Sequence, residues 1–256
     1  FDQVDGLGMM LGQVDESADD TWSRALGVEG PMTWRYGLEY FVGAVASGHG
    51  DVVWSAGELL AILIMEKRDI FENIFERDIS ALRVLEVGAG TGLPSLAAAL
   101  RGAQVLATDA RNPAAIYSLA KTATALHRKQ PQVQFSVAPL NFGEILCNES
   151  PFDVILAADT IYNPESHTQL LHTVKHSLKP QTGIAVFSYA LHKNVSDTQV
   201  RNFFHLANEF GFLVDHSRPG IQMPLTDSMR GLCCDTSRAF VYITLLSLPS
   251  SSSSSQ

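Results

Sequence analysis

The sequence predicts an α/β fold: a seven-stranded, mostly parallel sheet with an antiparallel last strand, helices on both faces and an N-terminal helical extension. Short apolar and β-branched runs alternate with helical segments between residues 83 and 215, and this alternation requires parallel strands joined by right-handed crossovers. No helical pattern separates the last two runs, 212–215 and 239–246, so we expect an antiparallel hairpin there at one edge of the sheet.

Turn and helix signals set the boundaries within the sheet region. Pro94 in a first helical turn and Gly102 just past the end of the same helix stand at the positions where these residues are favoured. Gly211 closes the last helix before the hairpin. The expected strands are 84–87, 105–108, 133–137, 152–158, 182–189, 212–215 and 239–246, and the helices between them are 94–100, 112–129, 166–177 and 198–210.

A helical extension is expected ahead of the sheet. After Met32, the residues Trp34, Leu38 and Phe41 recur at helical spacing, which predicts a helix that ends at Gly48. Its aromatic side chains either pack on the core or form a lid over a ligand pocket, and the sequence leaves both interpretations open. Two further helices are expected at 58–67, which is apolar nearly all round, and at 69–78.

These patterns divide the 256 residues into four parts. Residues 1–20 carry acids without a base and are expected to form a flexible arm. The helical extension follows at 21–80, and the ligand-binding α/β domain at 81–247. The serine run within 248–256 predicts a disordered tail.

Composition bounds the compartment and the partners. A net charge of −9 without a basic run argues against a nucleic-acid partner. The three cysteines are an odd number without a C-x-x-C pair, which favours a reducing compartment and free thiols. The longest apolar run, 59–65, is too short to span a bilayer, and no signal-peptide pattern opens the chain. We therefore expect a cytoplasmic monomer without a membrane partner.

No metal site is expected. Zinc and similar ions require clustered His, Cys or carboxylate ligands. Three histidines of one predicted helix have no carboxylate placed beside them and are interpreted as surface residues: His167, His172 and His176.

The stretch 83–92, RVLEVGAGTG, is the most informative segment of the chain. Its first half predicts a buried strand, and Gly88, Gly90 and Gly92 predict a sharp turn into a helix that lets the backbone approach a ligand closely. A dinucleotide fingerprint would require glycine where Leu93 stands, and no Lys-Ser/Thr pair follows as in a phosphate-binding loop. A plain tight turn is the alternative interpretation of the glycines alone.

The positions of two carboxylates favour a ligand-binding turn over a plain tight turn. Glu86 stands two residues before the first glycine, where an acid suits a cationic amine better than a pyrophosphate. Asp109 ends the next apolar run, and an acid at a strand tip can accept hydrogen bonds from both hydroxyls of a ribose. An amine joined to an adenosine describes S-adenosylmethionine.

Ligands of parallel α/β sheets bind beyond the carboxyl ends of the strands. The expected topology brings five segments around one cleft at this edge: 88–92, Asp109, 141–142, 159–162 and 188–192.

Four segments, in order, resemble motifs of the class I, seven-stranded S-adenosylmethionine-dependent methyltransferases, which have a Rossmann-like fold. Within that class they are similar to methyltransferase family 16, which holds many protein-lysine methyltransferases. The segments are the Trp-containing pre-motif at 53–56, motif I at 84–95, the ribose-binding Asp109 and the D-x-x-Y motif at 159–162.

The resemblance covers about residues 50–245. Segments 163–167, 202–204 and 209–212 look closest to the fungal nicotinamide N-methyltransferase-like members, a group also linked to methylation of a translation elongation factor.

The resemblance implies a role for each matching residue at the methionine and ribose end. Glu86 would hold the methionine amine, and Asp109 the ribose. Gly88, Gly90 and Gly92 would lie against the methionyl and adenosyl groups through their backbone.

At the adenine end the chain departs from the family. The family usually has Asp-Trp-Gly after the third strand, whereas this sequence has Asn-Phe-Gly. Phe142 can still pack on the adenine ring, and Asn141 replaces a charged acceptor by an amide. Trp54 and Ala158 complete the cofactor contacts that the resemblance implies.

Asp159 and Tyr162 are the expected catalytic residues. Methyl transfer is an in-line displacement onto a lone pair, so a carboxylate at the pocket floor can orient an amine and a tyrosine can pack on it or bond to it. The alternative interpretation is that Asp159 caps the following turn and Tyr162 packs in the core.

The leading hypothesis is an S-adenosylmethionine-dependent N-methyltransferase that acts on a protein lysine or N-terminal amine, a translation factor among the candidates. One alternative keeps the cofactor and changes the acceptor to a small molecule, such as a nicotinamide-like base or a fungal metabolite. A second alternative is a cofactor-binding protein that no longer methylates, which the Asn141-Phe142 departure keeps open.

Overall fold

The computed structural model of the protein describes residues 16–43, 53–66, 79–191, 195–222 and 240–249. Its main sheet contains β3 (Arg83–Val87), β4 (Gln104–Asp109), β5 (Phe135–Pro139), β6 (Val154–Ala158), β7 (Ile184–Ala190), β8 (Leu213–Asp215), β9 (Ile221–Gln222) and β10 (Phe240–Ser247).

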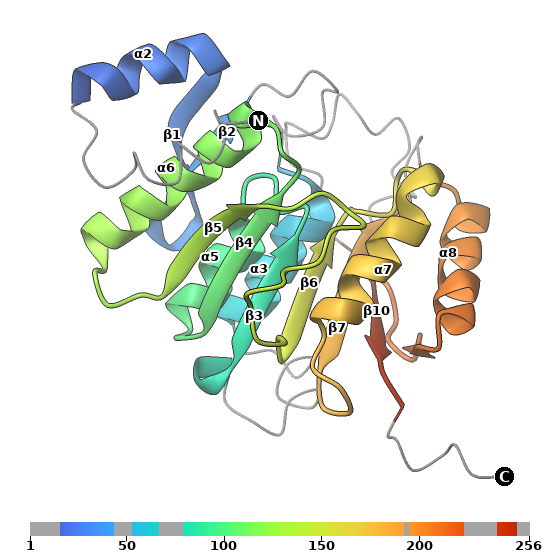
Figure 1. Cartoon of the computed structure of the whole chain (residues 1–256). Helices are drawn as coiled ribbons and strands as arrows, with labels where there is room; N and C mark the ends of the chain where they lie inside the picture. Colours follow the sequence, from blue (N-terminus) through green and yellow to red (C-terminus); the bar gives the residue numbers. More distant parts are fainter. Residues whose placement is uncertain (1–15, 44–52, 67–78, 192–194, 223–239, 250–256) are drawn as a thin grey trace, which may run out of the picture.

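Figure 1 shows the strands in the order β5-β4-β3-β6-β7-β10. Strand β8 follows β10 at the edge, and the short β9 also pairs with β10. Strands β5, β4, β3, β6 and β7 pair in parallel, whereas β10 runs antiparallel to β7, β8 and β9. The predicted fold class is confirmed. The antiparallel pairing of the last two expected strands is present, and β10 in addition inserts between β7 and β8.

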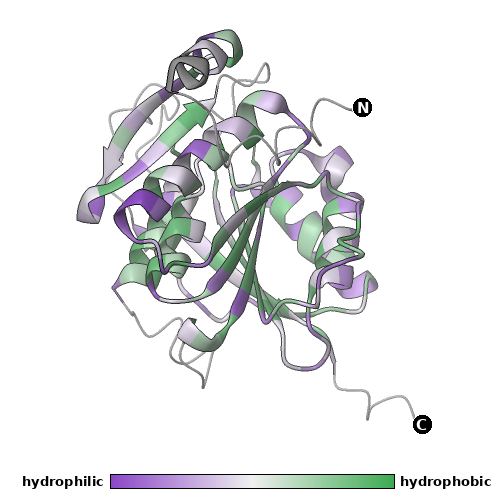
Figure 2. Ribbon diagram, turned by 60° about the vertical axis from the view of Figure 1, so that its left-hand side comes forward, coloured by the Kyte–Doolittle hydropathy of each residue, from purple (hydrophilic) through white to green (hydrophobic). Residues whose placement is uncertain are grey.

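Helices cover both faces of the sheet, as Figure 2 shows. Along β6, Val154 and Leu156 face one apolar core, while Ile155 and Ala157 face the other. This alternation explains why the strand sequence is apolar throughout. The helices are α3 (Ser55–Met65), α5 (Leu93–Leu100) and α6 (Pro113–Lys129) on one face and α7 (His167–Ser177) and α8 (Asp197–Glu209) on the other. Among the described helices, none is long and apolar enough to cross a membrane.

Within the sheet region, the expected boundaries agree with the observed ones to within two residues. The buried helix expected at 58–67 is α3. Short 3₁₀ turns lie at Arg35–Gly37, Ile79–Ala81 and Pro164–Ser166.

The prediction of a helix after Met32 is wrong. Strands β1 (Val28–Trp34) and β2 (Leu38–Gly43) form an antiparallel hairpin instead. Tyr36 and Gly37 in its turn have left-handed backbone angles, φ 64° and 70°, which break a helix. Trp34, Leu38 and Phe41 satisfy helical spacing, but they also point inward from a hairpin, and all three are buried.

Contacts with α6 fix the position of this hairpin. The Phe41 backbone N–H donates to the Thr122 hydroxyl at 3.0 Å. A side chain at Gly43 would come within 2.5 Å of the Ala114 carbonyl oxygen, so glycine permits the close approach of β2 to α6. Trp34 and Phe41 are buried against the domain, which is one of the two interpretations that the sequence left open, whereas Tyr36 in the turn is 54% exposed.

The first described element, α2 (Glu16–Leu26), overlaps the end of the expected arm 1–20. The rest of that arm, the helix expected at 69–78, the end of the helix expected after Met32 and most of the tail 248–256 lie outside the described residues.

Candidate functional site

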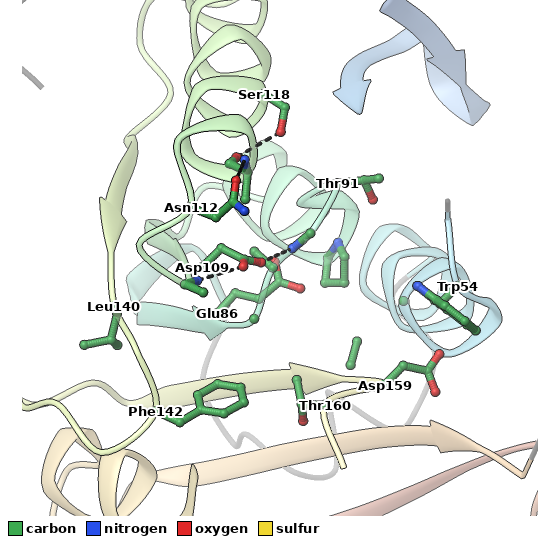
Figure 3. A pocket seen from close by; sticks show the side chains of 18 of the residues that line it. Trp54, Glu86, Thr91, Asp109, Asn112, Ser118, Leu140, Phe142, Asp159 and Thr160 are labelled. Atoms are coloured by element: carbon green, nitrogen blue, oxygen red, sulfur yellow. Dashed lines mark hydrogen bonds between the residues drawn. The ribbon is translucent and has the colours of Figure 1, made fainter. Parts of the chain in front are cut away.

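A pocket of about 280 Å³ lies at the carboxyl ends of β3, β4, β5 and β6 (Figure 3). Pairing of Val87 with Thr108 sets the glycine bend after β3 beside the end of β4. Ten of the eleven predicted site residues line the pocket: Trp54, Glu86, Gly88, Gly90, Asp109, Asn141, Phe142, Ala158, Asp159 and Tyr162.

The glycine bend forms one wall. Gly88 has φ 65°, and a side chain there would meet Thr160 Cγ2 at 3.1 Å and the Phe142 ring at 3.4 Å. Gly90 has φ 53° and faces open space. Gly92, the eleventh predicted residue, is not in the pocket lining: it precedes α5 with φ 72°, and its Cα lies against Leu119, where a Cβ would come within 2.9 Å. The third glycine thus serves helix packing.

Glu86 lies under the bend with 1% of its surface exposed. Its Oε2 accepts a hydrogen bond from the Ser95 backbone N–H at 2.9 Å, which ties the acid to the first turn of α5. Burial raises the pKa of Glu86 to about 8, and the charge of nearby Asp109 adds to the effect. A cation that enters the pocket will therefore favour release of the Glu86 proton.

Asp109 reaches the same pocket from the end of β4. Its Oδ2 accepts from the Gly90 N–H and its Oδ1 from the Ala110 N–H, both at 2.7 Å. Burial raises the pKa of Asp109, while these two hydrogen bonds oppose the rise. Glu86 and Asp109 lie side by side on the wall opposite Phe142 (Figure 3).

The loop after β5 supplies the facing wall. Phe142 presents its ring to the cavity beside Gly88 (Figure 3). Asn141 accepts from the Arg111 backbone N–H at 3.1 Å and donates through Nδ2 to Glu144 Oε1, also at 3.1 Å. Although desolvation alone would raise the pKa of Glu144, hydrogen bonds from Arg111 and Asn141 hold this pKa below its usual value.

Asp159 joins three distant segments of the chain. Its backbone has φ 49°, a left-handed conformation that is rare outside glycine. Its Oδ2 accepts from the Ala56 N–H and its Oδ1 from the Ala190 N–H, each at 3.2 Å. The carboxylate thus caps the N-terminus of α3, and not the turn after it that the alternative interpretation proposed. Burial raises the pKa of Asp159 to about 7.

Tyr162 stands at the rim, 37% exposed, and is not packed in the core. Burial of part of the ring and the charge of Asp109 raise its pKa. In the loop between Asp159 and Tyr162, the Ile161 carbonyl accepts a hydrogen bond from His167 Nε2 at 3.0 Å. The prediction that His167 is a surface residue is wrong, since it is 5% exposed and packs edge-on against Phe203.

Several pocket residues were missed by sequence reasoning. Asn112 accepts from the Ala114 and Ala115 N–H groups and caps α6, and the Asn-Pro start of that helix was the signal that could have identified it. Five further lining residues lie inside the quoted motifs without having been singled out: Val53, Ala89, Thr91, Pro94 and Thr160. The remaining missed residues lie outside any motif: Gly57, Ala110, Ala115, Ser118 and Leu140. Among the described residues, no group of three His, Cys, Asp or Glu side chains is arranged to hold a metal ion.

Comparison with known proteins gives consistent matches. A sequence model described as "Lysine methyltransferase" matches residues 41–210. The chain is 36% identical over 134 residues to protein N-lysine methyltransferase METTL21A of Danio rerio, an alignment that covers 50% of this chain and 56% of that protein. It is 32% identical over 172 residues to protein N-terminal and lysine N-methyltransferase efm7 of Neurospora crassa, covering 57% of this chain and 59% of that protein.

The matched part of the chain therefore spans less than two thirds of these two relatives. Among solved structures, the CcbJ methyltransferase from Streptomyces caelestis superposes with a TM-score of 0.51 at 14% identity, covering 78% of this chain and 92% of that one. At this identity the likeness concerns the fold alone.

Proposed function

The chain belongs to the lysine methyltransferase family, and from that premise we propose that it transfers the methyl group of S-adenosylmethionine to a protein amine, either a lysine side chain or an N-terminal amine. One observation carries the proposal: two carboxylates from neighbouring strands, the buried Glu86 and the half-buried Asp109, open into one pocket beside a glycine bend.

The residues fit the cofactor. A Cβ at Gly88 would fill the space between the bend and Thr160, so the absence of a side chain there keeps a cradle open for a ligand. Glu86 is a buried acid whose charge would be balanced by the amino group of the methionine part. Asp109 ends β4, where ribose-binding acids of α/β folds stand.

Each end of the cofactor would have its own partners. Glu86 would hold the amine, the backbone at Gly88 and Gly90 the methionyl and adenosyl groups, and Asp109 the ribose hydroxyls. The purine would lie between Phe142 and the loop after β4, in contact with Asn141. Trp54 and Ala158 would close the cavity from α3 and β6. When bound, the cofactor supplies an electrophilic methyl group on a sulfonium.

The acceptor amine would meet the D-x-x-Y loop. Each Asp159 oxygen accepts one backbone N–H and keeps a lone pair that can accept from an incoming amine. Tyr162 stands at the pocket rim, where its ring or hydroxyl can contact the same nitrogen. Both residues act by orienting the nitrogen lone pair, and orientation of this kind can contribute several kcal/mol to a barrier.

The names of the relatives favour a protein acceptor over a small molecule. A translation factor, implied by the resemblance to the fungal members, is the acceptor that we propose first. A cytoplasmic monomer remains our prediction for the protein in the cell.

Calorimetric titration with S-adenosylmethionine, paired with transfer of a tritiated methyl group into a cell lysate, tests this function. We expect binding by the wild type and label in a protein band. Label in small molecules alone would replace the protein acceptor by a metabolite, and binding without any label would favour the non-methylating alternative. Asp197→Asn, which changes an exposed acid of α8, is the matched control and should bind and transfer as the wild type does.

A further inference from the structure

The loops after β4 and β5 are joined by a compact polar network at the adenine end of the pocket. Arg111 Nε lies 3.2 Å from Glu144 Oε1. Glu144 Oε2 accepts from the Asn141 backbone N–H at 3.1 Å, while Oε1 accepts from the Asn141 side-chain Nδ2 at 3.1 Å. The Arg111 backbone N–H donates to Asn141 Oδ1 at 3.1 Å. Arg111 and Glu144 thus hold Asn141 from both sides.

The partners fix which way the Asn141 amide points. Its oxygen faces a backbone N–H, which can only donate, and its nitrogen faces a carboxylate, which accepts. A flipped amide would set donor against donor and acceptor against acceptor. Within the described part of the chain, one amide hydrogen and one oxygen lone pair are then left over on a residue that lines the pocket.

The loop is also held from behind. The Gly143 N–H donates to the Thr173 hydroxyl of α7 at 2.8 Å, and that hydroxyl donates to the Glu144 carbonyl at 3.1 Å. The Leu140 N–H donates to the Asp109 carbonyl at 2.7 Å. Glu144 is therefore anchored through its backbone as well as through its side chain.

A fixed amide distinguishes purines. Adenine offers an amino donor at its six-position next to a ring acceptor, and a carboxamide pairs with such an edge through its acceptor and its donor. Hypoxanthine carries an oxygen in place of the amino group and a ring N–H at N1 in place of the ring acceptor, so this edge matches only a flipped amide.

We propose that Glu144, held by Arg111, is a positioning residue that makes the pocket selective for adenine by preventing the Asn141 amide from turning over. The inference rests on the proposed function, since it assigns the adenosyl end of the same pocket. The family usually has an acid where Asn141 stands. In this chain the carboxylate comes instead from Glu144, three residues later.

Calorimetry with S-adenosylhomocysteine and its hypoxanthine analogue S-inosylhomocysteine tests the proposal. The wild type should prefer the adenine ligand. In Glu144→Ala this preference should narrow by about fivefold to tenfold, the factor of one hydrogen bond, and in Arg111→Met by less. Asp197→Ala removes an exposed acid that also pairs with an arginine, Arg201, and should leave the preference unchanged. Melting temperatures verify that each variant is folded.

A charge exchange provides the second test. Asn141→Asp alone sets two carboxylates in contact and should weaken S-adenosylhomocysteine binding, because like charges at this distance repel. Asn141→Asp combined with Glu144→Gln restores one acid and one amide and should recover most of the affinity.

An unchanged preference in Glu144→Ala, or no recovery in the double variant, overturns the inference while the proposed function stands. Failure of the wild type to bind S-adenosylhomocysteine overturns both.

Discussion

The two ends of the pocket are built in different ways. At the cofactor end, Glu86, the glycine bend and Asp109 come from one β-α-β unit, and backbone hydrogen bonds between Gly90, Ser95 and these acids complete it. At the acceptor end, Asp159 draws together α3 and the end of β7, which are far apart in sequence. The first end depends on local geometry, whereas the second depends on one carboxylate that also holds the fold. Substitutions at the cofactor end should therefore change ligand affinity more than stability. Substitutions at the acceptor end should change both methyl transfer and the free energy of unfolding.

The largest effect is expected from Asp159→Ala. Methyl transfer should fall by about 100-fold or more, the range for a group that positions a reacting nitrogen. Because the same carboxylate caps α3, the free energy of unfolding should also decrease, by about 1–2 kcal/mol. Tritium transfer and chemical denaturation measure the two losses, and S-adenosylmethionine affinity should change by less than the transfer rate does. An equal loss of affinity and transfer would assign Asp159 to the cofactor end and remove the contrast.

Glu86→Gln tests the cofactor end of the pocket. Loss of a charge-assisted hydrogen bond to the methionine amine should weaken S-adenosylmethionine binding by about 10- to 100-fold. 5′-Methylthioadenosine lacks that amine, so its affinity should be the same in the variant and the wild type. Calorimetry with both ligands gives the result. Equal weakening of both ligands would indicate a distorted pocket and not a lost amine contact.

The pH dependence follows from the same acid. The amine favours ionised Glu86, so S-adenosylmethionine affinity should rise as the pH increases toward about 8, the pKa of Glu86 in the free protein. The free energy of unfolding of the free protein should have the opposite pH dependence and decrease as the pH rises. A raised carboxyl pKa means that the folded state binds the proton more tightly than the unfolded state, so the contribution of Glu86 and Asp159 is lost as the pH rises through about 7 to 8.

Denaturation and titration series from about pH 4 to about pH 9 measure both slopes. In Glu86→Gln the affinity slope should flatten, whereas the stability slope should become shallower by the share of Glu86, since Asp159 still titrates. A variant that keeps the wild-type slopes would exclude Glu86 as their source.

The smallest effect on the pocket is expected from a change in the hairpin. Thr122→Val removes the acceptor of the Phe41 N–H and should lower the free energy of unfolding by about 1–3 kcal/mol, with cofactor affinity unchanged. Thr124→Val is the matched control, since among the described residues that hydroxyl bonds only to the Ala120 carbonyl within α6, at 2.9 Å. If the two variants were equally stable, the hairpin would contribute nothing through this contact.

The same contrast explains what the sequence could predict. Strand β3, the glycine bend and the acids were predictable because short-range spacing encodes them. The bonds of Asp159 to Ala56 and Ala190 were not, because they depend on a tertiary meeting of three segments. The hairpin was mistaken for a helix because its inward residues share helical spacing, and only the left-handed Tyr36-Gly37 turn distinguishes the two. Buried His167 carries no pattern that separates it from its exposed neighbours.

Insertion of β10 between β7 and β8 has a consequence for biosynthesis. A nascent chain that ends before Phe240 leaves facing edges of β7 and β8 without their backbone partners, although both strands have already been made. Unpaired edges of this kind recruit strands from other molecules. Synthesis of β10 is thus the event that completes the sheet, and a chain truncated before Phe240 should aggregate.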